Sequence, residues 1–217
     1  MQCITFTRSI VLFCLIIVHL TESAPQVDQL YHEYKSSNSG QLKTKIIRLL
    51  VKDITGYDDN DRKNIEKIIR YGLNDKQALV VQEAVFAAGK FESKSLMPEL
   101  YKLYRNGCNQ YPGSQGIIKQ KIIKAIGKIG GTEREIFFIE EINSKKISRE
   151  TELILSILLD NDKLSKKIVA STVALRDALA QIINNLEETP ENSIKYSQHR
   201  MILSLANALI AKNTQSE

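Results

Sequence analysis

The chain has 217 residues, of which 43% are hydrophobic, 25% charged and 6% aromatic, and its formal net charge at pH 7 is +5. This length and apolar content allow one domain with a continuous core, and they exclude collagen-like and intrinsically disordered chains. The net charge suits solubility and is far weaker than that of a nucleic-acid-binding tail, so we expect no nucleic-acid partner.

The first 24 residues are typical of a secretory signal. Arg8 gives the positive start, an apolar run of about 11 residues follows over 10–20, and small residues end the segment. A membrane-spanning helix needs roughly 20 apolar residues. We therefore expect cleavage after Ser23 or Ala24 and an exported protein, with the periplasm or cell envelope favoured over full secretion. An uncleaved 10–20 segment that anchors the chain is the alternative.

Cleavage there would remove Cys3 and Cys14 and leave Cys108 as the remaining thiol. One thiol cannot form a disulfide within the domain, so packing has to stabilise the fold. Cys108 lies in the turn-rich stretch RNGCNQYPGSQG, where we expect it to be partly exposed. It is either an incidental loop cysteine or half of an intermolecular disulfide, and a catalytic role is a third alternative.

Beyond Gln41 the apolar residues recur with helical rather than alternating periodicity. Residues 25–40, which include SSNSG, precede this pattern and are expected to form a flexible leader, and 214–217 a short tail. The pattern predicts roughly nine helices, over 41–54, 60–73, 76–90, 96–106, 118–129, 136–142, 153–159, 168–186 and 194–210. Each has an apolar face that one helix cannot bury alone, so an all-helical fold of packed neighbours is expected.

Polar residues mark the expected helix starts. The expected N-caps are Asp75, Thr132 in a capping box with Glu135, Ser148, and Thr189 followed by Pro190. The linkers between the periodic segments are short. Sequential helices should therefore be antiparallel neighbours.

Two segments 38 residues apart share one pattern. EAVFAAGKF, beginning at Glu83, aligns with KIIKAIGKI, beginning at Lys121, with the Gly-Lys pair and the apolar positions in register. One copy of AAGK could be an ordinary helix end with a glycine terminator, but two copies in register, each followed by an amphipathic helix, favour a repeat. A period of this length holds two helices and two turns, and stacking such pairs buries a continuous core.

On these residues, and on the second-helix segments LMPELYKLY and EIFFIEEI, the chain resembles the HEAT-repeat family. The resemblance is best over 73–143; residues 41–72 look like an earlier degenerate pair, and 148–213 are degenerate repeats or a cap. It implies a HEAT-like α-solenoid over 41–213, in which small residues let adjacent helices approach closely. The residues expected to have this role are Gly89, Gly127, Ala84, Ala88 and Ala125.

No combination of residues in the sequence points to catalysis. His32 and His199 are far apart in the chain, and no zinc, phosphate-loop or calcium-loop spacing occurs. The acidic run 58–61 lacks the closing glutamate of a calcium loop and is typical of a helix N-terminus. We expect a non-enzyme without metal or cofactor; an enzyme whose residues come from separate repeats is the alternative.

The resemblance implies that the second helix of each pair lines a concave face, where partners dock. The candidate partner-binding residues are Lys63, Lys67, Arg70, Tyr101, Lys102, Tyr104 and Arg105. Tyr and Arg are frequent interface anchors, although Tyr101 and Tyr104 could instead complete helix packing. We expect an exported, non-catalytic scaffold or adaptor that docks a protein or peptide on this face; a membrane-anchored envelope structural or assembly protein is the alternative.

Overall fold

A computed structural model describes residues 27–52, 54–144, 148–160, 164–185 and 193–214. Within these ranges the regular structure consists of ten α-helices and two short 3-10 helices, without a strand. This confirms the all-helical fold that the periodicity predicts. The expected signal segment over 1–24, the cap at Thr189 and residues 215–217 of the expected tail lie outside the described residues.

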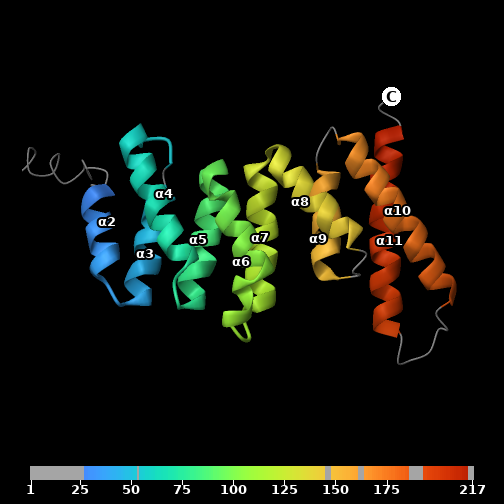
Figure 1. The fold of residues 1–217 in the computed structure, drawn as a ribbon, viewed down its shortest axis with the longest axis horizontal. Helices are drawn as coiled ribbons and strands as arrows, with labels where there is room; N and C mark the ends of the chain where they lie inside the picture. Colours follow the sequence, from blue (N-terminus) through green and yellow to red (C-terminus); the bar gives the residue numbers. More distant parts are fainter. Residues whose placement is uncertain (1–26, 53, 145–147, 161–163, 186–192, 215–217) are drawn as a thin grey trace, which may run out of the picture.

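The helices follow one another along the long axis of the molecule, from α2 at one end to α10 and α11 at the other (Figure 1). The α-helices are α2 (Val27–Ser36), α3 (Gly40–Leu50), α4 (Asp59–Leu73), α5 (Ala78–Phe91), α6 (Met97–Arg105), α7 (Gln115–Ile129), α8 (Gly131–Asn143), α9 (Arg149–Leu159), α10 (Lys166–Asn185) and α11 (Ser193–Thr214). The 3-10 helices are η1 (Lys94–Leu96) and η2 (Gly107–Gln110). Every helix expected from the sequence is present, with ends that differ by a few residues.

Helix α2 is the one α-helix of the described ranges that the sequence did not lead us to expect. The expectation of a flexible leader is wrong for residues 27–36, which form this helix and pack against α3 and α4. Its apolar residues Val27, Leu30, Tyr31 and Tyr34 have helical spacing, and Val27 and Tyr34 are buried. The SSNSG stretch, which suggested flexibility, instead spans the short connection between α2 and α3.

The helices pack in two rows. In one row α3, α5, α7, α9 and α11 each contact the next, and in the other α2 contacts α4, α4 contacts α6, and α8 contacts α10. Consecutive helices such as α4 and α5, or α10 and α11, contact each other across the rows. Buried apolar side chains between the rows form one continuous core, from Val27 in α2 to Leu209 in α11.

Two glycines of the 38-residue repeat lie where helices of one row meet. A Cβ at Gly89 in α5 would lie 2.7 Å from the Cα of Ala125 in α7. A Cβ at Gly127 in α7 would lie 3.0 Å from Cγ2 of Ile157 in α9. Ala84 and Ala88 of α5 and Ala125 of α7 are also buried. Small side chains therefore occupy the contacts between α5 and its neighbours.

Two helix starts agree with the sequence. Asp58 is the N-cap of α4, and its Oδ1 accepts a hydrogen bond from the Asp61 N–H at 2.8 Å. Ser148 is the N-cap of α9, and its hydroxyl accepts from the Thr151 N–H at 3.3 Å. Each cap satisfies a backbone donor that has no acceptor within its own helix.

The two other described caps differ from expectation. Helix α8 begins at Gly131, with Gly130 as its N-cap, and both glycines have a positive φ, of +82° and +70°. Thr132 therefore lies inside the first turn, and the expected capping box is absent. Asp75 is not the N-cap of α5; that residue is Gln77, which provides no side-chain cap. The Asp75 carboxylate nonetheless accepts the Gln77 N–H at 2.9 Å, just before the helix.

Candidate functional site

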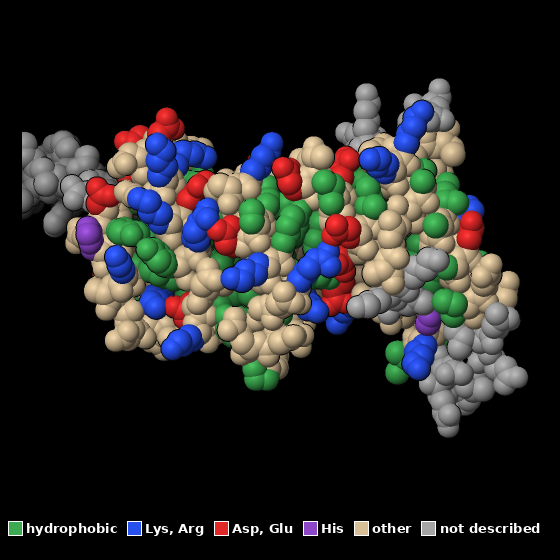
Figure 2. Space-filling model, in the orientation of Figure 1, with side chains coloured by type: hydrophobic (Ala, Val, Ile, Leu, Met, Phe, Trp, Pro, Cys, Tyr) green, Lys and Arg blue, Asp and Glu red, His purple; other side chains and the backbone are tan. Residues whose placement is uncertain are grey.

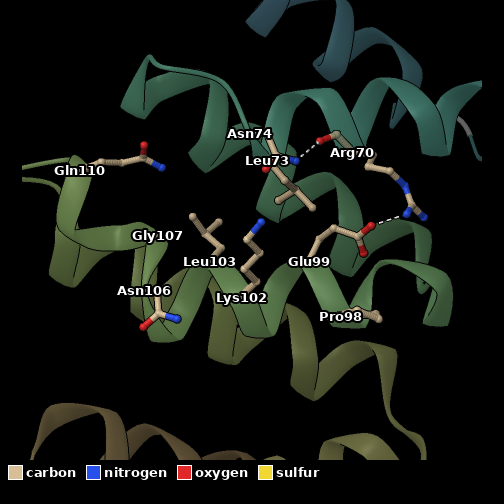
Figure 3. A pocket seen from close by; sticks show the side chains of 10 residues that line it. All are labelled: Arg70, Leu73, Asn74, Pro98, Glu99, Lys102, Leu103, Asn106, Gly107 and Gln110. Carbon is tan, nitrogen blue, oxygen red and sulfur yellow. Dashed lines mark hydrogen bonds and ion pairs between the residues drawn. The ribbon is translucent and has the colours of Figure 1, made fainter.

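A groove of about 670 Å³ lies between α4 and α6 (Figure 3). Its walls come from the end of α4, the outer side of α6 and the following 3-10 helix η2. The lining residues are Arg70, Leu73, Asn74, Pro98, Glu99, Lys102, Leu103, Asn106, Gly107 and Gln110. We call this feature the α4–α6 groove.

One end of the groove is held by an ion pair between the two helices. The Arg70 guanidinium on α4 contacts the Glu99 carboxylate on α6 and donates a second hydrogen bond to the Ser95 carbonyl at 3.2 Å. The second carboxylate oxygen of Glu99 is buried and accepts no hydrogen bond from the described residues. This pair links the two helices at one end of the groove.

The middle of the groove combines an apolar floor with a lysine. Leu73 and Leu103 are buried and form the floor. Lys102 is exposed, its ammonium points toward Leu73 across the groove, and it makes no ion pair or hydrogen bond with the part of the chain that the structure describes (Figure 3). The Asn74 amide donates to the Arg70 carbonyl at 2.9 Å, and Gln110 lies at the far end. This arrangement can hold apolar side chains beside an acidic group.

Two of the sequence-predicted residues, Arg70 and Lys102, lie together in this groove. Lys63 and Lys67 are exposed on α4 but do not line it, and the Lys67 ammonium donates to the Asn64 side chain at 3.1 Å. Figure 2 shows Lys and Arg side chains scattered over the face that carries these helices, with acidic side chains among them. Of the predicted basic residues, Arg70 and Lys102 converge in the groove, whereas Lys63 and Lys67 do not.

The two predicted tyrosines pack between α6 and α8. Tyr104 is buried, its ring meets that of Phe137 edge to face at 5.0 Å, and its hydroxyl donates to Glu141 at 2.9 Å. Tyr101 stacks on the same Phe137 at 5.2 Å, and its hydroxyl donates to the Glu133 carbonyl. Burial, followed by the charge of Glu133, raises the pKa of Tyr101 to about 12. Both side chains complete helix packing, the alternative left open by the sequence.

Arg105, the remaining predicted residue, lies outside the groove as well. Its guanidinium pairs with Glu140 of α8 at 2.5 Å. It borders a smaller pocket of about 370 Å³ together with Tyr104, Lys119, Glu141 and Glu150. Two basic and two acidic side chains balance each other in this lining. The pocket therefore has less uncompensated charge to offer a partner than the groove.

Several groove residues were not predicted from the sequence. Asn74 ends α4, and Gln110 belongs to η2, a short element that follows α6 and has no periodic signal. The residues meet because α6 and η2 return alongside the end of α4. No local pattern in the sequence marks this meeting.

The expectation of a partly exposed Cys108 is wrong. The residue lies in η2 with only 1% of its surface exposed. Burial raises the pKa of its thiol to about 11, and nearby Lys119 lowers it by less. A buried, protonated thiol is a poor nucleophile and is badly placed for a disulfide between chains.

Within the described ranges, His, Cys, Asp and Glu side chains form no cluster suited to a metal ion. His32 is exposed on α2 and His199 is buried on α11, at opposite ends of the molecule (Figure 1). The His199 ring contacts the Lys195 carbonyl. Among the same described helices, none is both long and apolar enough to span a membrane.

No protein-family model matches the chain, and neither a curated protein nor a solved structure matches it. The resemblance to HEAT repeats therefore depends on the residues of this chain alone. The functional interpretation of the chain depends on the geometry of the α4–α6 groove.

Proposed function

We propose that this chain is an exported, non-catalytic scaffold or adaptor with a HEAT-like solenoid fold, which docks a protein or peptide in the α4–α6 groove. The observation that carries the proposal is the groove itself, where side-chain amides and a lysine without an ion pair among the described residues surround an apolar floor. No turnover is required of these groups. Their role is to bind and orient a partner.

The solenoid part of the proposal is supported by the two rows of helices and by the repeated glycines. Gly89 contacts α7 and Gly127 contacts α9, so the same repeat position meets the next helix of its row in both copies. A unit that repeats its contact with the following unit is the property that defines a stacked array. The second helices of the expected pairs, α4 and α6, provide the walls of the groove.

The docking part is supported by size and chemistry. A volume of about 670 Å³ falls within the range of roughly 300–1,000 Å³ that is usual for ligand pockets. Leu73 and Leu103 contribute the small apolar surface at the base of the groove, and Lys102 can pair with an acidic side chain of a partner. Asn74 and Gln110 supply amide groups that match the hydrogen-bonding groups of a peptide backbone.

A site-specific photocrosslinker tests this proposal. We would introduce it at position 102 in the groove and, as a matched control, at position 124, where Lys124 is equally an exposed lysine on a helix. Illumination in the native host should give a discrete protein adduct from position 102 and not from 124. The purified partner should then bind the parent chain more tightly than Lys102→Glu. Equal adducts from both positions, or equal affinities, would refute docking in the groove.

Export is tested separately, on the mature N-terminus. The signal-like pattern over 1–24 leads us to expect a protein that begins at Ala24 or Pro25. N-terminal sequencing and intact mass of protein from its own host decide this. An intact residue 10–20 segment would instead favour the anchored alternative.

A further inference from the structure

Asn106 and Gly107 join α6 to η2, and they are the single Asn-Gly pair in the sequence. In such a pair the backbone nitrogen of the second residue can attack the side-chain Cγ of the first, which closes a five-membered ring. Glycine favours this reaction because it has no Cβ to hinder the approach and leaves the backbone free to rotate. In a folded chain the reaction further requires that both reacting groups are free of hydrogen bonds.

The side chain of Asn106 is free. It is exposed, and in Figure 3 it extends from the end of α6 away from α4. It does not cap η2, the helix that follows, and it makes no hydrogen bond with a described residue. Water therefore reaches both the Cγ atom and the amide group that would leave.

The backbone N–H of Gly107 is free as well. Gly107 is the first residue of η2, so its N–H has no acceptor within that short helix. The N–H before it, that of Asn106, donates to the Lys102 carbonyl at 3.1 Å, whereas no described backbone group outside η2 accepts from Gly107. The residue is also partly exposed. Its nitrogen is therefore available to attack.

Two other asparagines of the described ranges, Asn38 and Asn143, precede a serine and lack this freedom. The Ser39 N–H donates to the Ser37 hydroxyl at 3.0 Å. The Ser144 N–H donates to the Glu140 carbonyl, also at 3.0 Å. In both pairs the nitrogen that would attack is held by a hydrogen bond, and the serine has a Cβ. The two pairs are internal controls for the Asn-Gly pair.

We propose that Asn106 is a self-modification site, at which the folded chain converts asparagine to aspartate and isoaspartate. The Gly107 nitrogen loses its proton and bonds to the Asn106 Cγ, the Cγ–Nδ2 bond breaks, and ammonia leaves with a proton. One water then opens the cyclic imide. Attack of that water at Cγ gives aspartate, and attack at the main-chain carbonyl carbon gives isoaspartate, in which the backbone runs through the former side chain.

The modification would change the charge of the α4–α6 groove. Asn106 lines both this groove and the smaller pocket beside Arg105. The groove lining has two cations, Arg70 and Lys102, and one anion, Glu99, which together give +1. A carboxylate at position 106 brings that sum to zero, so an acidic partner should bind the groove less tightly. This consequence rests on the proposed function, whereas the modification itself does not.

The test is isotope labelling of the purified protein. The protein is kept at neutral pH in H₂¹⁸O, once folded and once in urea, and its peptides are then read by mass spectrometry. Asn106 should take up ¹⁸O, as aspartate and isoaspartate, at similar rates in both states. Asn38 and Asn143 should react up to about tenfold more slowly when folded than in urea, since a hydrogen bond has to open first. The proposal is overturned if folding slows Asn106 as much as it slows Asn143.

Variants test the mechanism. Asn106→Gln should take up no label over the same period, because glutamine would have to close a six-membered ring. Equal labelling of position 106 in the parent and in this variant would contradict attack by Gly107, since direct hydrolysis by water does not depend on ring size. The matched control Asn109→Gln, at another exposed asparagine of η2, should leave the labelling of Asn106 unchanged. A groove partner that binds Asn106→Asp as tightly as the parent would contradict the effect on docking alone.

Discussion

Gly89 in α5 lies against the backbone of Ala125 in α7, so closely that a Cβ at position 89 would be 2.7 Å from the Ala125 Cα. In the 38-residue register Ala125 corresponds to Ala87, two residues before Gly89 in the preceding copy. At this contact a small residue of the first copy faces a small residue of the second. The glycine of the first copy therefore has a packing role.

Gly89→Ala should therefore destabilise the protein although alanine is the better helix former. The added methyl group meets backbone, which cannot move out of the way as a side chain can, and overpacking of this kind costs about 1–3 kcal/mol. Urea unfolding monitored by circular dichroism measures the effect. Gly116→Ala is the matched control: it lies in α7 with nothing within 4 Å of the new Cβ, and it should stabilise by roughly 0.5–1 kcal/mol.

Gly127 should be more tolerant of alanine than Gly89. The nearest neighbour of a new Cβ at position 127 is the side chain of Ile157, at 3.0 Å, and that side chain can adjust. We expect Gly127→Ala to cost less than Gly89→Ala, and Gly127→Leu to cost about 1–3 kcal/mol or more. Parent-like unfolding of Gly127→Leu would contradict a close approach of α7 and α9 at this residue.

Cys108 should react slowly with thiol reagents in the folded protein. Its thiol is buried, with the pKa raised to about 11, so little thiolate is present at pH 8. Iodoacetamide labelling read by peptide mass spectrometry isolates this cysteine from Cys3 and Cys14. Labelling should accelerate strongly in denaturant. Equal rates with and without denaturant would show that η2 is open in the native state.

The Arg48–Glu83 pair between α3 and α5 predicts an acid-sensitive contribution to stability. Hydrogen bonds from Arg48 lower the pKa of Glu83 below its ordinary value of 4.5. A lowered carboxyl pKa stabilises the folded state above the unfolded-state pKa, and this contribution disappears as the pH falls through the folded-state value. Glu83→Gln should melt a few degrees below the parent at pH 7, and the difference should shrink below pH 4.5. A difference that is constant over this range would exclude the ionised pair as its cause.

Glu92→Gly should stabilise the end of α5. Glu92 is the C-cap and has a φ of +50°, a left-handed conformation that costs a non-glycine residue roughly 1–2 kcal/mol. Part of that cost is offset because glycine loses more backbone entropy on folding, so a gain of about 0.5–1 kcal/mol is expected. Glu92→Ala keeps the Cβ and should give no gain, which separates backbone strain from the removal of a charge.

The helices could be predicted from the sequence because their signal is local. Apolar spacing located α3–α11, the acidic run 58–61 indicated the start of α4, and the expected cap at Ser148 located the start of α9. Helix α8 begins one residue before the expected cap at Thr132, at Gly131, and no capping pattern in the sequence marks the positive φ of Gly130 and Gly131. The apolar residues of α2 have helical spacing in the sequence. The adjacent SSNSG stretch is typical of a flexible connection, so no helix was expected there.

The sequence by itself determined that the chain is helical, which faces are apolar, and that one pattern of small residues occurs twice, 38 positions apart. Only the tertiary structure decided that Tyr104 and Cys108 are buried, and that Arg70 and Lys102 share a groove with Gln110. The physical reason is the range of the forces involved. Periodicity and capping act within one or two turns, whereas burial and convergence depend on which helix returns to cover a face, and that is fixed by the packing of the whole core.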